Sequence, residues 1–290
     1  MVSTLVIGLG INMKVRLFCL LVLLGSCTGN NRAIKVKGSD TEVNLAVTLA
    51  EHFYQVNSHF CVAISGGGSG MGIASLLNGQ ADIANSSRPL NEEEVDLFRK
   101  KGIALKTIVF AEDATAFIVN KNNPLDSIDV NTLAAILSGR ERTWQAIAGR
   151  PLKVNIYGRQ SNSGTHSFVG HKLKIQFSQD AKEMNGNAQI IEGVKLDESG
   201  IGYVGAGYLA AGGKMPVKVL RITGLQGGPA VSPLDAQAIQ EHRYFFQRPL
   251  YQFIRATSWE RVAAFIAFEQ SAEGQAIIKR SGYYIVNSNH

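Results

Sequence analysis

The segment AIKVKGSDTEVNLAVTLAEHFY, residues 33–54, joins two periodic patterns through a short polar turn. Residues 33–37 alternate apolar and charged side chains, which predicts a β-strand. From Val43 to Tyr54 the apolar residues recur at helical spacing, which predicts an amphipathic helix. Between them, Ser39 and Glu42 have the spacing of a capping box, so we expect the backbone N–H groups of a helix start there. The segment predicts a strand–turn–helix unit of an α/β fold.

The same alternation continues along the chain. Further strands are predicted at 61–65, 81–85, 105–110, 116–120, 154–157, 201–204 and 250–255. Further helices are predicted at 73–77, 92–101, 131–138, 165–173, 259–269 and 272–281. Asn91 and Glu94 form a second capping pair, and Glu112-Asp113 is expected to separate two strands. This order predicts a mainly parallel sheet covered by helices on both faces.

Composition narrows the function classes. Of the 290 residues, 45% are hydrophobic and 18% are charged, so the chain can bury a substantial core. The net charge is +6, and the basic residues are scattered along the chain. A nucleic-acid binder concentrates positive charge on one face, so no nucleic-acid partner is expected. The three cysteines give no disulfide framework, and Cys61 is expected to be a small buried strand residue. The six histidines show no metal-ligand spacing, so no metal or cofactor is expected.

Residues 1–27 have the pattern of a signal peptide. Lys14 and Arg16 precede an apolar run at 17–24, which is too short to span a bilayer. Leu24-Gly25-Ser26-Cys27 resembles a bacterial lipobox, which implies cleavage before Cys27 and acylation of its thiol. Residues 28–32 would then form a polar tether, and the protein would be exported and lipid-anchored in the bacterial cell envelope, facing the periplasm or the outer surface of the cytoplasmic membrane. An ordinary secretory signal that contains a cysteine is the alternative.

Small polar residues gather in four loops that each follow a predicted strand and precede a helix. These loops are Gly38–Glu42, Ser65–Gly72, Asn85–Pro89 and Arg159–Thr165. Helix N-termini attract anions, and open α/β sheets bind ligands at the carboxyl ends of their strands. Each loop alone has the composition of a purely structural helix cap. Together, and with Arg159 among them, the loops predict a site for a small oxyanion.

Several motifs resemble those of the periplasmic phosphate-binding proteins of phosphate-specific ABC transporters. They are Lys37–Thr41, Gly68–Gly70, Asp82–Pro89, Arg159–Thr165 and Gly200–Tyr203, within a similarity that runs from Ile34 to Tyr284. The resemblance implies the type II periplasmic-binding-protein fold, in which two lobes are joined by crossover strands. We expect residues 33–112 plus 245–290 to form lobe 1 and residues 113–244 to form lobe 2.

The resemblance also implies a function and a set of binding residues. The chain would capture inorganic phosphate between the lobes and deliver it to ABC permease subunits for import, as a monomer and without catalysing a reaction. The phosphate-binding positions carried over are Ser39, Asp40, Thr41, Ser69, Ser87, Arg159, Ser163, Gly164 and Thr165.

Two positions depart from the family pattern. Some members have an acidic residue where Ser87 stands, which accepts the proton of hydrogen phosphate, and another where Ser161 stands, which orients the arginine. Because sulfate lacks that proton near neutral pH, a buried acceptor discriminates phosphate from sulfate. We hypothesise that Asp40 replaces the missing acceptor; the alternative is a solvent-facing acid at a helix start.

Three other functions are alternatives to phosphate capture. The same fold could bind or sense sulfate, molybdate or another oxyanion. A hydrolase is disfavoured because Ser69 lacks the Gly-x-Ser-x-Gly pattern of a nucleophile elbow. A dinucleotide enzyme is disfavoured because Gly205–Ala210 fits G-x-G-x-x-A, but no acid stands near residues 225–229.

Overall fold

The computed structural model describes residues 33–210 and 215–286. The predicted signal peptide, the lipid-attachment residue Cys27 and the tether lie outside the described residues. These described residues belong to one compact unit. Within the described part of the chain, every helix is too short or too polar to cross a membrane.

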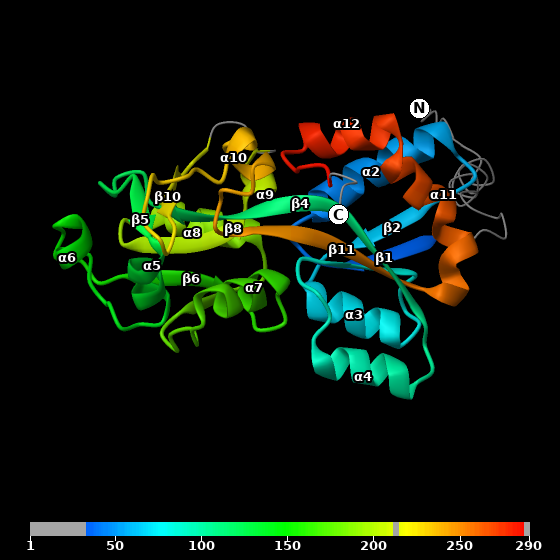
Figure 1. Cartoon of the computed structure of the whole chain (residues 1–290), viewed down its shortest axis with the longest axis horizontal. Helices are drawn as coiled ribbons and strands as arrows, with labels where there is room; N and C mark the ends of the chain where they lie inside the picture. Colours follow the sequence, from blue (N-terminus) through cyan, green and yellow to red (C-terminus); the bar gives the residue numbers. More distant parts are fainter. Residues whose placement is uncertain (1–32, 211–214, 287–290) are drawn as a thin grey trace, which may run out of the picture. The chain divides into compact units, whose positions relative to one another are not determined.

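Most strands belong to one mixed sheet with the order β2-β1-β3-β11-β4-β8-β6-β7, and β9 also pairs with β4 (Figure 1). The strands are β1 (Ile34–Gly38), β2 (Val62–Ser65), β3 (Ile83–Ser86), β4 (Leu105–Val119), β6 (Asn155–Arg159), β7 (Lys182–Met184), β8 (Gly200–Gly205), β9 (Lys218–Val219) and β11 (Gln247–Arg255). A separate parallel pair consists of β5 (Ser127–Asp129) and β10 (Arg221–Thr223). Strands β1, β2 and β3 are parallel, as are β6, β7 and β8, so the parallel sheet predicted from strand–helix alternation is present in two stretches.

Strand β4 connects these two stretches. Its residues 105–114 pair antiparallel with β11, and its residues 115–119 pair antiparallel with β8. We call β2, β1, β3, β11 and the first part of β4 the first half-sheet, and the remaining strands the second half-sheet. The predicted break at Glu112-Asp113 is wrong, because Asp113 is fully buried against Arg248 and Glu112 bridges to Tyr284, so both acids are accommodated within a continuous strand.

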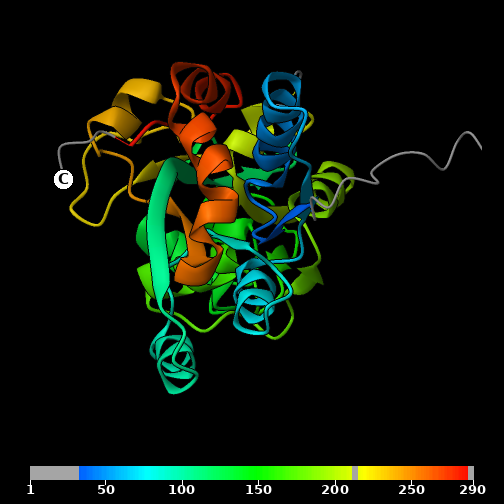
Figure 2. The same cartoon turned by 90° about the vertical axis from the view of Figure 1, so that its right-hand side faces the viewer.

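Helices cover both faces of the first half-sheet (Figures 1 and 2). One face carries α2 (Val43–Val56), α11 (Trp259–Gln270) and α12 (Ala272–Arg280), and the other carries α3 (Ser69–Leu77) and α4 (Glu92–Lys100). Neighbouring residues of β3 point to opposite faces, so Ile83 joins the core under α2 while Ala84 joins the core under α3. This two-sided burial explains why Ile83 and Ala84 are both apolar although they are neighbours in the strand.

The second half-sheet has its own core. Its helices are α5 (Val130–Leu137), α6 (Gln145–Ala148), α7 (Gly164–Leu173), α8 (Asn187–Leu196), α9 (Ala206–Ala210) and α10 (Ala236–Gln240). Phe117, Trp144, Tyr203 and Phe246 are fully buried in this core. The indole N–H of Trp144 donates to the Ser199 carbonyl oxygen at 3.0 Å, which satisfies its polar atom.

Local capping signals were correct at one predicted helix start and wrong at another. The Asn91 and Glu94 pair forms the predicted capping box at α4. At α2 the predicted box is absent: Glu42 is the N-cap residue without a capping side chain, and Ser39 Oγ accepts instead from the Thr41 N–H. The prediction for Cys61 is also wrong, because this residue is exposed and precedes the edge strand β2.

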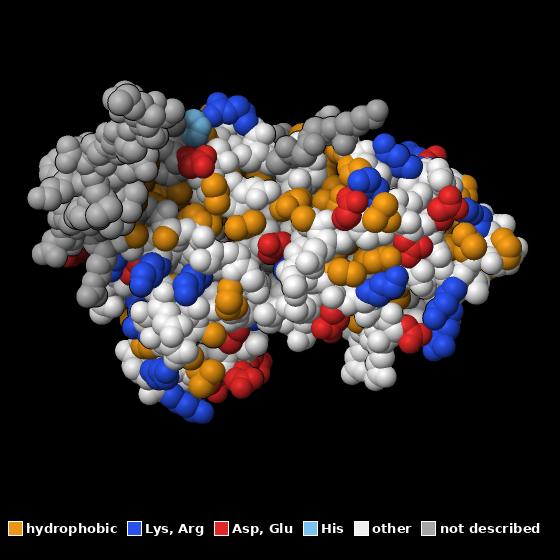
Figure 3. Space-filling model, turned by 180° about the vertical axis from the view of Figure 1, so that it is seen from behind, with side chains coloured by type: hydrophobic (Ala, Val, Ile, Leu, Met, Phe, Trp, Pro, Cys, Tyr) orange, Lys and Arg blue, Asp and Glu red, His pale blue; other side chains and the backbone are white. Residues whose placement is uncertain are grey.

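Lys and Arg side chains are interspersed with Asp and Glu on the face of the molecule in Figure 3. The charged projection at the lower left of that view is α4, with Glu92 and Glu93 in its first turn and Arg99 and Lys100 in its last. This distribution is favourable for the helix dipole.

Replacing Glu269 by Gln tests a buried carboxyl of α11. Burial raises the pKa of Glu269 from 4.5 to about 8, so between these values the folded protein keeps a proton that the unfolded chain loses. Because the two pKa values differ, the free energy of unfolding of the wild type falls by up to about 1.4 kcal/mol per pH unit as the pH rises from 4.5 to about 8. Above pH 8 it falls no further on this account. We expect urea unfolding to show Glu269→Gln becoming more stable relative to wild type from pH 4.5 to pH 8.

Glu260→Gln provides the control, because Glu260 is exposed on the same helix. Its difference from wild type should stay nearly constant with pH. The same constancy in Glu269→Gln would contradict the prediction.

Candidate functional site

The carboxyl ends of β1, β3 and β6 meet the N-terminal ends of α3 and α7. Parallel pairing places the loops after β1 and β3 at one edge of the first half-sheet, and the loop after β6 at the corresponding edge of the second. Gly70 N–H donates to the Asn162 carbonyl oxygen at 3.0 Å, which joins the glycine-rich loop to the loop before α7. All four loops predicted from the sequence therefore lie together.

A cluster of buried hydroxyl groups lies where these loops meet. We call it the hydroxyl cluster; it consists of Ser39, Thr41, Ser69, Ser87 and Thr165, each at most 4% exposed. Ser39 Oγ is 3.2 Å from Ser87 Oγ, which lies 3.5 Å from Ser69 Oγ. Thr41 Oγ1 is 3.1 Å from Thr165 Oγ1. The cluster spans the two half-sheets, since Thr165 belongs to α7 and the other members belong to the first half.

Two glycines allow the backbones to approach closely at the cluster. Gly38 has a φ of +142°, and a Cβ there would lie 2.0 Å from the Asn85 carbonyl oxygen. A Cβ on Gly164 would lie 2.3 Å from Ser69 Oγ and 2.5 Å from Ser87 Oγ. A larger residue at position 164 would therefore push the start of α7 away from the cluster.

Ser163 lies at the same helix start but uses its hydroxyl differently. It is 2% exposed and is the N-cap of α7, where its Oγ accepts from the His166 N–H at 3.4 Å. The first N–H groups of α7 have no partner within the helix and point toward its N-terminal end. The predicted role of this loop as an anion-facing helix start fits this geometry.

Arg159 ends β6 and is 3% exposed. Its Nη2 donates to the Asn185 carbonyl oxygen at 3.0 Å, and its Nη1 lies 3.5 Å from Asp40 Oδ2. Among the described residues, its buried Nε has no hydrogen-bond partner. Burial lowers the pKa of Arg159 and Asp40 opposes that change, but an arginine stays charged at any physiological pH. The site thus holds a buried cation with an unused donor.

Asp40 links the first loop to the second half of the molecule. Its Oδ2 accepts from the backbone N–H of Asn187 at 2.9 Å and from Asn187 Nδ2 at 3.1 Å. Ser161, at the position where some family members have the acid that orients the arginine, is exposed. Asp40 is therefore placed to orient Arg159, a role that it can combine with accepting the proton of the ligand, as the sequence hypothesis proposes.

Arg248 is a second buried guanidinium beside the cluster, and no sequence pattern predicted it. Its Nη2 donates to Asp113 Oδ2 at 2.9 Å and to Thr41 Oγ1 at 3.2 Å. Burial raises the pKa of Asp113, and the charge of Arg248 opposes this rise. Arg248 stands in the strand segment Gln247–Leu250, far along the sequence from both partners. The residues around it, Gln247 and Pro249 among them, give no local sign that it is buried.

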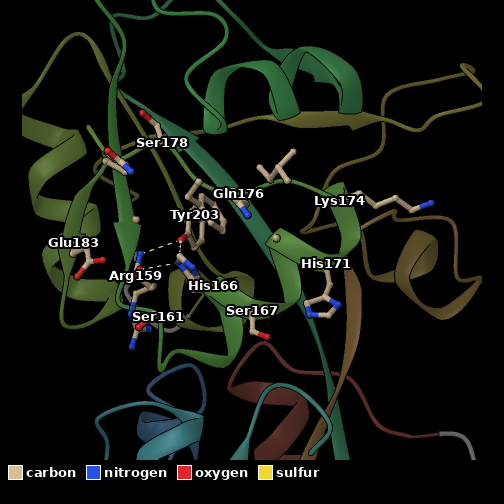
Figure 4. Close-up of a pocket in the computed structure, with 16 residues that line it drawn as sticks. Arg159, Ser161, His166, Ser167, His171, Lys174, Gln176, Ser178, Glu183 and Tyr203 are labelled. Atoms are coloured by element: carbon tan, nitrogen blue, oxygen red, sulfur yellow. Dashed lines mark hydrogen bonds between the residues drawn. The ribbon is translucent and has the colours of Figure 1, made fainter. Parts of the chain in front are cut away.

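A cavity of about 810 Å³ lies beside Arg159 (Figure 4). It is lined by α7 and the following loop, and the hydroxyl cluster is not part of its wall. His166 Nδ1 lies 2.9 Å from the Arg159 carbonyl oxygen and 3.3 Å from the Tyr203 hydroxyl, which itself accepts from the Arg159 N–H at 3.0 Å. Burial lowers the pKa of His166, which favours the neutral ring. These contacts hold the turn that presents Arg159.

The chemistry of the site is that of a receptor for an oxyanion. It offers neutral hydroxyl donors, a helix start and a buried guanidinium, which suit the oxygens of a tetrahedral anion. In the part of the chain that the structure describes, His, Cys, Asp and Glu side chains do not gather in threes as metal ligands would.

Comparisons with known proteins agree with this geometry. Residues 26–273 match the family model described as the PBP superfamily domain, so the chain belongs to that superfamily. The phosphate-binding protein PstS of Staphylococcus aureus is 27% identical over 277 residues, which cover 90% of this chain and 84% of that protein. PstS of Borreliella burgdorferi is 28% identical over 274 residues, which cover 90% and 93%.

A solved structure supports the fold. The substrate-binding protein from Clostridium perfringens with bound phosphate superposes with a TM-score of 0.79 at 23% identity, over 88% of this chain and all of that one. The predicted α/β architecture of the type II periplasmic-binding-protein fold is confirmed.

Gly164→Ala tests the close approach at the cluster. Because the added Cβ would lie 2.3 Å from Ser69 Oγ, we expect the start of α7 to be displaced and the free energy of unfolding to fall by about 1–3 kcal/mol. Urea unfolding measures the loss, and small-angle scattering should show a larger radius of gyration. Gly224→Ala is the control, because a Cβ there meets nothing within 4 Å. If the two variants have equal free energies of unfolding and equal radii of gyration, the serine hydroxyls accommodate the added Cβ without loss of stability, and the prediction is wrong.

Proposed function

We propose that this protein captures inorganic phosphate at the hydroxyl cluster and delivers it to the permease subunits of an ABC transporter for import. The observation that carries the proposal is that buried hydroxyls from both halves of the molecule meet beside Arg159, whose Nε is an unused buried donor. A tetrahedral anion would take over the hydrogen bonds that these hydroxyls make with one another. Both curated relatives described above are phosphate-binding proteins, which supports phosphate as the ligand.

The ligand-binding residues are those carried over from the sequence. Ser39, Thr41, Ser69, Ser87 and Thr165 would donate hydroxyl hydrogen bonds, and Arg159 would donate from its guanidinium. The Ser163–Gly164 turn would contribute backbone N–H groups, and Asp40 would accept the proton of hydrogen phosphate. Charge-assisted hydrogen bonds contribute roughly 1.5–3 kcal/mol each, so a few suffice for micromolar binding, about −8 kcal/mol.

Two lobes divided as predicted, residues 33–112 plus 245–290 and residues 113–244, would close on the anion. Two features support this division: β4 changes its pairing partner from β11 to β8 after Ala114, and the chain returns through Phe246 to β11. Closure would bury the ligand and create the surface that the permease recognises. We further propose that the protein is exported, works as a monomer, and is held at the cell envelope by a lipid on Cys27.

Calorimetry of residues 33–290 against phosphate, arsenate, sulfate and molybdate tests the ligand. We expect phosphate to bind with micromolar or tighter affinity and sulfate to bind more weakly. Preference for sulfate or molybdate would assign the site to another oxyanion, and an absence of binding to all four would overturn the proposal.

Arg159→Ala tests the charged donor. We expect phosphate affinity to fall by at least about 100-fold, since a buried charged partner is lost at roughly 3 kcal/mol or more. Arg150→Ala is the matched control, because Arg150 pairs with the exposed Glu198 on the same half of the molecule. An Arg159→Ala variant that binds like wild type would remove Arg159 from the site.

Asp40→Asn tests the acceptor hypothesis. An amide keeps the size of the side chain but disfavours the proton of hydrogen phosphate, so the preference for phosphate over sulfate should fall by about tenfold or more. Competition calorimetry with both anions measures the ratio. If both affinities fall together, Asp40 acts through Arg159 and Asn187 and is not the discriminator.

A further inference from the structure

Glu42 is a buried carboxyl group that the proposed binding chemistry does not use. It is 0% exposed, although it lies directly before α2 in a polar turn. Among the described residues, neither of its carboxyl oxygens has a hydrogen-bond partner. The sequence pattern assigned it to a capping box that the structure does not form. A carboxyl buried in this way needs another explanation, because burial of an unpaired charge is costly.

Charged and titratable groups from several elements face this carboxyl. They are Arg248 of β11, Asp113 of β4, Arg159 of β6, Tyr283 after α12, and Asp40 in its own turn. Burial raises the pKa of Glu42 from 4.5 to about 8, and the Ser39 hydroxyl and Arg248 limit the rise. Glu42 is therefore neutral at pH 7. Tyr283 also stays neutral, because burial raises its pKa and its hydroxyl donates to the Thr41 carbonyl oxygen at 2.6 Å.

Ser39 belongs to the hydroxyl cluster and stands three residues before Glu42 in the same turn, where its hydroxyl favours the ionised form of that carboxyl. Its Oγ accepts from the Thr41 N–H at 3.2 Å and donates its single hydrogen to Ser87 Oγ at 3.2 Å. A neutral carboxyl can donate a hydrogen bond, so it leaves that hydrogen pointing into the cluster. An ionised carboxylate only accepts, so it competes for the same hydrogen and turns it away.

We propose that the neutral acid form of Glu42 determines the affinity of the cluster for oxyanions, by keeping the Ser39 hydroxyl directed at the ligand and by withholding a negative charge beneath it. This inference rests on the proposed function, since it requires an anion at the cluster. It concerns a residue outside the set carried over from the family. Its direct consequence is that anion binding and protonation of Glu42 favour each other.

Thermodynamic linkage sets the size of the effect. A bound dianion raises the proton affinity of a nearby carboxyl, so the complex keeps the proton at pH values where the free protein loses it. Above the pKa of the free protein, affinity then falls by about tenfold per pH unit. His166 does not interfere, because burial lowers its pKa and it is already neutral at alkaline pH.

Calorimetry with inorganic phosphate and residues 33–290, whose described part belongs to one compact unit, tests the inference. Titrations at about pH 8, 9 and 10 use a ligand that is the dianion throughout. Wild-type affinity should weaken by about tenfold per unit above pH 8, whereas Glu42→Gln, which is neutral at every pH, should vary by less than about threefold. Glu51→Gln is the matched control, because Glu51 is exposed on α2; this variant should follow the wild type.

A second measurement needs no variant. At about pH 9, titrations in buffers of different ionisation enthalpy should report uptake of close to one proton per phosphate bound to the wild type. No proton uptake with a pH-independent affinity overturns the role of Glu42 and leaves phosphate binding intact. A parallel alkaline loss in Glu42→Gln assigns the proton to another group. Failure of the wild type to bind phosphate at neutral pH overturns the proposed function itself.

Discussion

A buried ion pair between Asp113 and Arg248 holds the two halves of the sheet in register at the point where they meet. Asp113 lies on β4, Arg248 lies on the adjacent strand β11, and both side chains are at most 1% exposed. Because each charge is removed from water, removing one partner of such a pair typically costs about 3–5 kcal/mol. The guanidinium also donates to Thr41, so the interaction that organises the strand crossing also fixes one member of the hydroxyl cluster.

The hydroxyl cluster shows how an anion site can be built mainly from neutral groups. Its buried serine and threonine side chains satisfy one another, as at the 3.1 Å contact between Thr41 and Thr165, so burial leaves few polar atoms unpaired. Arg159 is restrained by Asp40 and by the Asn185 carbonyl oxygen, which orients its positive charge before any ligand arrives. Neutral hydroxyl donors that are already in place cost less to remove from water than charged groups. The N-terminal end of α7 still attracts a negatively charged ligand.

Local sequence signals predicted the parts of the site that lie next to the elements that build them. The loop Asn85–Pro89 and the loop Arg159–Thr165, which opens a helix, follow from small polar residues between periodic segments. The pattern failed where distant residues decide the outcome. The Glu42 capping box does not form because its carboxyl is drawn into the interior, and Arg248 has no local signal because its partners lie 135 and 207 residues away. Similarly, β4 continues through Glu112-Asp113 only because the partner strand supplies the compensating charge.

Where β4 passes from one half-sheet to the other, its residues 111–114 pair antiparallel with residues 247–250 of β11. This stretch is a two-stranded ribbon, because β3 pairs with β11 at residues 251–254 and β8 pairs with β4 from Thr115 onward. Such a ribbon resists stretching, since every backbone hydrogen bond would have to lengthen, but it twists readily. Its register shifts between Leu250 and Tyr251, a few residues from the ion pair, and irregularities of this kind increase local twist. A motion of one half relative to the other would therefore be torsional: the distance between them along the ribbon would stay nearly fixed while their faces rotate.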